Sequence, residues 1–116
     1  MKTKNTKTTK NQIDACELLE TLEITSIMPR MKAGAAWVKG KIAGHRFDAL
    51  TFRGHADFED YELESSRISK LWVQRIEDRV TVANFDRGWD IRPTTELAKA
   101  IVGLLAAGLA EHVHGE

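Results

Sequence analysis

The sequence predicts a small α+β domain, in which a four-stranded antiparallel sheet of two hairpins packs against an N-terminal and a C-terminal helix. Apolar residues recur at helical spacing in residues 11–23 and again after Pro93. Between them, two segments alternate in hydrophobicity with the period of a β-strand. The length of 116 residues fits one domain. We expect residues 1–10 to form a flexible basic tail and residues 11–116 to form the domain.

The two N-terminal segments differ in their capacity to fold. Residues 1–10 contain four lysines and no acid, and they cannot bury enough apolar surface to offset the entropy of ordering. In residues 11–23, Asn11 is a suitable helix N-cap. The apolar stripe of this helix consists of Ile13, Cys16, Leu19 and Leu22. Because Cys16 belongs to the stripe, we expect its thiol to be buried. Met28-Pro29-Arg30 then ends the helical pattern.

Residues 35–52 predict a hairpin that turns at Ala43-Gly44. This register places Ile42 opposite His45, and Phe47 can then cover the bare Gly40. Further pairs are Lys41 with Arg46, Lys39 with Asp48, Val38 with Ala49 and Trp37 with Leu50. The Lys41–Arg46 pair is unfavourable. One face carries Val38, Ile42, Phe47 and Ala49, and the other carries Trp37, Leu50 and Phe52.

Residues 68–85 predict a second hairpin, with its turn at Glu77-Asp78. In this register Val73 lies opposite Val82 and Trp72 lies opposite Ala83. One face would then hold Leu71, Val73, Val80 and Val82, and the other Trp72, Ile76 and Phe85. The following Asp86-Arg87-Gly88-Trp89-Asp90 ends the strand, with Gly88 as a turn or bulge residue.

The last predicted helix begins at Pro93-Thr94-Thr95-Glu96, where Thr94 or Thr95 can act as the N-cap. Its apolar face consists of Leu97, Ile101, Leu104, Leu105 and Leu109. We expect this face to cover one side of the sheet. His112 and His114 lie near its C-terminal end, where the helix dipole favours a cation.

The composition excludes several classes of protein. Seventeen basic residues balance seventeen acidic ones, which argues against a uniformly basic nucleic-acid coat. A lone Cys16 cannot form an internal disulfide. The chain begins without an apolar signal sequence, and its longest uncharged run, residues 100–110, is about half a membrane span. We therefore expect a cytoplasmic location and no membrane partner.

No residue pattern points to catalysis or to a cofactor. The sequence lacks the GxGxxG, GxxxxGK[ST], GxSxG and HExxH motifs. His112, His114 and Glu116 are too few and too close to the terminus to predict a metal site. Asp86 and Asp90 are suited to shaping a turn, with Trp89 closing the core edge. We predict a protein that is not an enzyme, with no catalytic residue, no cofactor and no metal.

Two segments are candidates for binding. The acidic, aromatic segment Asp57, Phe58, Glu59, Asp60, Tyr61 and Glu62 offers carboxylates that imitate phosphate spacing, beside apolar anchors for a protein partner. The alternative is a basic surface for nucleic acid, formed by Lys2, Lys4, Lys7, Lys10, Lys39, Lys41 and Arg46. Homodimerisation is compatible with both, since Trp37 and Trp72 need cover from the N-terminal helix or from a second subunit.

Segments 37–44, 66–71 and 84–90 give the chain a family resemblance. Over about residues 35–95, it resembles a family of small uncharacterised bacterial proteins carried on plasmids, integrative elements and phages. The most specific part is the DRGWD-type motif Asp86, Arg87, Gly88, Trp89 and Asp90. No activity is carried over from this family, and the motif has no assigned role. The resemblance implies an accessory protein of a mobile genetic element.

These observations lead to two main functional hypotheses, beside a less favoured third, a small enzyme that uses Asp86 or Asp90. The first is a non-enzymatic accessory protein that acts by protein–protein interaction, for example as an inhibitor of a host nucleic-acid-targeting defence complex (anti-CRISPR or anti-restriction). The alternative is a nucleic-acid-binding regulatory or accessory protein, in which lysine and arginine side chains contact phosphates.

Overall fold

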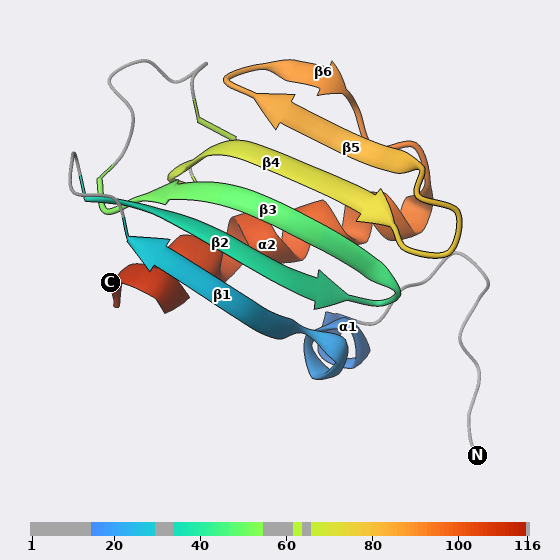
Figure 1. The fold of residues 1–116 in the computed structure, drawn as a ribbon, viewed down its shortest axis with the longest axis horizontal. Helices are drawn as coiled ribbons and strands as arrows, with labels where there is room; N and C mark the ends of the chain where they lie inside the picture. Colours follow the sequence, from blue (N-terminus) through green and yellow to red (C-terminus); the bar gives the residue numbers. More distant parts are fainter. Residues whose placement is uncertain (1–14, 30–33, 55–61, 64–65, 116) are drawn as a thin grey trace.

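The computed structural model describes residues 15–29, 34–54, 62–63 and 66–115. A short helix precedes six antiparallel strands, and a long helix follows them. The elements are α1 (Ala15–Thr21), β1 (Glu23–Pro29), β2 (Ala35–Ile42), β3 (His45–Phe52), β4 (Ile68–Arg75), β5 (Thr81–Asp86), β6 (Trp89–Ile91) and α2 (Glu96–His114). The strands lie side by side in chain order, from β1 to β6, and α2 crosses behind them (Figure 1).

The α+β class is confirmed, but the prediction of four strands is wrong because the sheet has six. One additional strand is β1, part of which was assigned to the helix over residues 11–23. Within that range the described helix ends at Thr21. Ile24 and Ile27 are β-branched and suit a strand, and Ile27 pairs with Val38 of β2. Pro29 ends β1 on the edge of the sheet, where a missing backbone donor is tolerated.

The other additional strand, β6, lies beyond the predicted end of the second hairpin. Arg87 (φ 54°) and Gly88 (φ 146°) turn the chain with left-handed backbone angles. The backbone N–H of Asp86 donates to the Gly88 carbonyl at 2.8 Å. Trp89 then pairs with Phe85, which makes this motif a tight hairpin rather than a strand end.

The first hairpin has the predicted register throughout. Ile42 lies opposite His45, and Ala43 and Gly44 turn the chain with φ of 48° and 76°. Phe47 covers Gly40 so closely that a Cβ on the glycine would lie 2.7 Å from the ring and 2.5 Å from the Glu23 carbonyl oxygen. Glycine is therefore required here by close approach of two neighbours.

The predicted register of the second hairpin holds next to the turn, where Gln74 pairs with Thr81, and is wrong by one residue from Val73 onward. Trp72 lies opposite Asn84 rather than Ala83, because a bulge interrupts the pairing next to Val73. A bulge adds one residue to one strand and so moves the following side chains to the other face. Phe85 consequently pairs with Leu71 on the buried face instead of sharing a face with Trp72.

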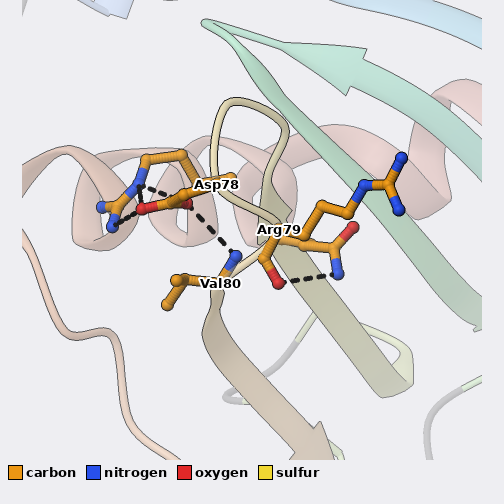
Figure 2. Close-up of polar contacts among 5 residues, drawn as sticks. Asp78, Arg79 and Val80 are labelled. Atoms are coloured by element: carbon orange, nitrogen blue, oxygen red, sulfur yellow. Dashed lines mark hydrogen bonds and ion pairs between the residues drawn. The ribbon is translucent and has the colours of Figure 1, made fainter.

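The β4–β5 turn is longer than the predicted two residues and is held by side chains (Figure 2). The Asp78 carboxylate accepts from the Arg75 guanidinium at 2.7 Å and from the Val80 backbone N–H at 3.2 Å. The Gln74 side chain donates to the Arg79 carbonyl at 3.1 Å. Arg79 has a φ of 60°, so this turn uses a left-handed residue without glycine.

The core lies between the sheet and α2. Thr95 is the N-cap of α2, and its hydroxyl accepts from the Ala98 backbone N–H at 2.9 Å. The buried residues of α2 are Ala98, Ile101, Val102, Leu105, Leu109 and Ala110. Leu18 of α1 completes the cluster. Cys16 is exposed, so the prediction of a buried thiol is wrong: the short helix turns Leu18 inward instead.

By length and composition alone, α2 could cross a membrane. In the fold, its apolar residues Ile101, Leu105 and Leu109 are buried in the core.

Candidate functional site

One face of the sheet has no cover from any described element. Helix α2 contacts β3, β4 and β5, and α1 contacts α2, so both helices lie on the same side. In Figure 1 the opposite face is turned toward the viewer, in front of α2. We call this surface the open face. Its central residues are Trp37, Lys39, Lys41, Arg46, Asp48, Leu50, Lys70, Trp72, Asn84 and Asp86.

The strand register orders the open face into rows, because directly opposite residues point to the same side of a sheet. One row consists of Met28, Trp37, Leu50, Lys70 and Asp86. The adjacent row consists of Ser26, Lys39, Asp48, Trp72 and Asn84. The two tryptophans therefore stand in neighbouring rows on β2 and β4, with β3 between them. Both are half-buried.

A shallow hollow of about 170 Å³ lies between these tryptophans. Its polar lining consists of Asp48, Lys70, Asn84 and Asp86. The Trp72 indole donates to the Thr81 hydroxyl at 3.2 Å, which fixes the ring on one wall. Lys70 forms an ion pair with Asp86 at 3.7 Å. The hollow thus has two aromatic walls and a polar lining.

Three cations lie beside this hollow. Lys41 is directly opposite Arg46, and Lys39 is directly opposite Asp48. Within the described part of the chain, none of these three cations forms an ion pair, although Glu23 lies across from Lys41 on the edge strand. Like charges placed directly opposite each other destabilise a sheet. An anion bound between Lys41 and Arg46 would relieve that repulsion.

The structure brings together only part of the predicted binding residues. Lys39, Lys41 and Arg46 share the open face, as the alternative hypothesis requires. The four tail lysines Lys2, Lys4, Lys7 and Lys10 lie outside the described residues, as do Asp57, Phe58, Glu59, Asp60 and Tyr61. Glu62, the remaining residue of the acidic segment, is buried.

The DRGWD-type motif stabilises the end of the sheet. The Trp89 ring meets Phe85 edge to face at 5.2 Å and packs against the core. The Arg92 guanidinium lies 6.0 Å from the centre of the Trp89 ring, within the range of a cation–π contact. The Arg87 backbone N–H donates to the Ser69 carbonyl at 2.9 Å. These contacts connect the β5–β6 hairpin to β4 and to the core.

The residues considered for acid–base or metal chemistry lie on β5, on β6 and in the last turn of α2. Asp86 and Asp90 are both exposed. The described ranges contain no cluster of three or more histidine, cysteine or acidic side chains that could hold a metal. His112 is exposed, while the His114 imidazole lies 3.1 Å from the Thr51 hydroxyl and ties the end of α2 to β3.

Sequence reasoning missed Asp48, Lys70 and Asn84 as members of a site. Asp48 was paired with Lys39 as a simple cross-strand contact. The available signal was the alternation of β3 and β4, which places these polar residues on the same side as Trp37 and Trp72. The bulge hid Asn84, because the uninterrupted register puts Ala83 opposite Trp72.

Fold and site together define a small α+β domain with one covered sheet face and one open, aromatic and partly basic face. Residues 36–110 match the model of a family described as a domain of unknown function (DUF7678). The chain belongs to this family. Neither the curated proteins nor the solved structures that were compared contain a match to the chain.

Proposed function

We propose that this protein is a non-enzymatic binding protein that holds single-stranded nucleic acid on the open face. One observation carries the proposal. Two half-buried tryptophans and three unpaired cations share a sheet face that no described element covers. Single-strand-binding proteins combine these features, since bases stack on aromatic rings while cations contact the backbone phosphates.

Charge distribution supports the same proposal. The net charge of the chain is zero, yet Lys39, Lys41 and Arg46 gather on β2 and β3. Lys41 and Arg46 lie directly opposite each other, and two adjacent cations can attract an anionic strand although Glu23, Asp48 and Asp86 lie nearby. A duplex presents its bases stacked inside, whereas a single strand can lay them on Trp37 and Trp72.

Two further parts of the proposal rest on the sequence. The resemblance of residues 35–95 supports an accessory protein of a mobile genetic element, and the composition supports a cytoplasmic location. Inhibition of a host defence complex through the acidic segment stays a prediction, because residues 57–61 lie outside the described residues. We favour the nucleic-acid interface because its three hairpin cations are brought together in the fold.

The proposal is tested by titrating the full chain with short labelled single-stranded DNA and RNA at low and moderate salt. We expect binding that weakens with salt, with an Arg46→Ala variant reducing the salt slope by about one. Lys99→Ala removes an exposed charge from α2 and serves as the matched control. Absence of binding at low salt would contradict the proposal. So would a dimer in sedimentation experiments that buries Trp37 and Trp72.

The aromatic contribution has its own test. Trp37→Ala and Trp72→Ala should each weaken oligonucleotide binding about five- to 150-fold, the range expected for one stacked base. Trp89 lies on the covered side, packed against Phe85. In a Trp37→Phe, Trp72→Phe double variant, its fluorescence should therefore remain unquenched by nucleic acid. Strong quenching in that variant would place the strand elsewhere.

A further inference from the structure

We propose that the hollow between Trp37 and Trp72 takes one guanine base, whose Watson–Crick edge is bound by the Asp48 carboxylate. This inference rests on the proposed function and names the base that the site selects. It follows from the size of the hollow, from the half-buried position of Asp48 without a partner among the described residues, and from the hydrogen-bonding patterns of the bases.

The hollow suits one flat ring system. Its volume of about 170 Å³ is below the range of about 300–1,000 Å³ usual for pockets that hold larger organic ligands. Trp37 and Trp72 supply surfaces against which a base can stack. Asp48, Lys70 and Asn84 supply the polar groups that can contact the edge of that base.

Asp48 is the polar group that most needs a partner. Its side chain is half-buried in the row that runs from Lys39 to Trp72. Within the described part of the chain it forms neither an ion pair nor a side-chain hydrogen bond. Partial burial of a carboxylate is costly unless donors reach it. Asp86, the other carboxylate of the hollow, already has Lys70 as a partner.

An ionised carboxylate accepts hydrogen bonds and donates none. It therefore selects a base with two neighbouring donors, to which its two oxygens can bond in parallel. Guanine offers such a pair, the N1–H and the N2 amino group. Adenine and cytosine place a ring acceptor beside their amino group, and uracil and thymine flank their single N–H with two carbonyl oxygens. Each of these arrangements sets a lone pair against the carboxylate.

The nearby cations make this assignment compatible with an anionic strand. Lys39 of β2 lies directly opposite Asp48, and Arg46 lies two residues along β3 on the same face. A base held by Asp48 leaves its sugar and phosphates to these cations. Lys39 and Arg46 offset the charge of Asp48 by lying near it, although neither forms an ion pair with it.

The experiment compares thymidine oligonucleotides that carry one central guanine, adenine, cytosine or inosine, titrated by anisotropy at fixed salt. We expect the guanine strand to bind about five- to 150-fold more tightly than the others, the range for one bidentate base contact. Inosine lacks the N2 amino group and should lose most of this advantage. Asp48→Asn, which keeps the shape of the side chain, should lower the affinity for the guanine strand to that for the adenine and cytosine strands.

Asp78→Asn is the matched control, because it removes the same charge from the distant β4–β5 turn and should keep the preference. Circular dichroism verifies that both variants fold. Equal binding of all strands, or an unchanged preference in Asp48→Asn, would overturn this inference and leave the proposed function standing. Absence of binding to every strand would overturn the proposed function as well.

Discussion

The two faces of the sheet differ in how completely folding buries their side chains. Along β3, Phe47 and Ala49 are fully buried beneath α2, while the alternating Arg46 is exposed and Asp48 is half-buried. The covered face is mainly apolar, and His45 and Thr51 are its buried polar residues on this strand. The open face mixes tryptophan, aliphatic and charged side chains on the same strands.

This difference teaches which residues the fold depends on. Burial of apolar surface supplies most of the stability of a small domain, and here that burial is concentrated between the sheet and α2. The open face contributes less to folding and keeps its aromatic rings and cations accessible. Substitutions on the two faces should therefore separate stability from binding.

The largest expected effect is that of Phe47→Ala on the covered face. Phe47 is fully buried, so we expect a loss of about 3–5 kcal/mol in the free energy of unfolding. Leu50→Ala, on the same strand but on the open face, should cost less than half as much because Leu50 is only half-buried. Urea denaturation measures both. Equal losses would break the distinction between the faces.

Gly40→Ala tests how closely the covered face is packed at its first hairpin. The added methyl would meet the Phe47 ring and the Glu23 carbonyl, both closer than 3.0 Å. We expect a loss of about 1–3 kcal/mol, as for other overpacked sites. Gly44→Ala adds a methyl that meets no neighbour, so any cost there reports backbone strain alone. Melting temperatures that rank Gly40→Ala as the milder change would contradict this assignment.

Thr95→Ala tests the helix that covers the sheet. Loss of the hydroxyl that accepts from Ala98 should reduce stability by about 1 kcal/mol. Thr95→Ser keeps the hydroxyl and should be nearly neutral. Chemical denaturation of the two variants measures the difference. If serine is as destabilising as alanine, the cap is not the source of the loss.

The smallest effect is expected at the β4–β5 turn, which lies on neither face. Hydrogen bonding from Arg75 lowers the pKa of Asp78. A carboxylate with a lowered pKa stabilises the fold above its ordinary pKa and loses that contribution as pH falls through the lower value. Wild type should thus exceed Asp78→Asn slightly in melting temperature at neutral pH. The difference should persist down to about pH 4, the ordinary pKa of an aspartate, and should shrink as pH falls further.

The sequence predicted the first hairpin better than the second hairpin or the number of strands. The predicted register of the first hairpin was correct because the two-residue turn at Ala43-Gly44 sets the pairing of every residue that follows. The predicted register of the second hairpin was shifted by one residue because the bulge next to Val73 leaves no separate signal in the hydrophobic pattern. Residues 23–29 were missed because the apolar spacing of α1 runs on to Leu22, directly before the β-branched residues of β1.

The candidate site was predictable only in part. Lys39, Lys41, Arg46 and Trp37 follow from the first hairpin alone. The hollow required Lys70, Trp72 and Asn84 from two other strands, and their neighbours depend on tertiary pairing and on the bulge. Local pattern therefore identified the cations of the site but not the cavity beside them.

The strand order has a consequence for how the chain matures during synthesis. Each strand pairs with the one made just before it, from β1 to β6, and such local pairing favours rapid folding. Helix α2 is made after all six strands. Until residues 96–114 leave the ribosome, the part of the apolar sheet face that α2 later covers is exposed and can bind chaperones or other nascent chains. All strands of the open face are therefore made before the helix that completes the core.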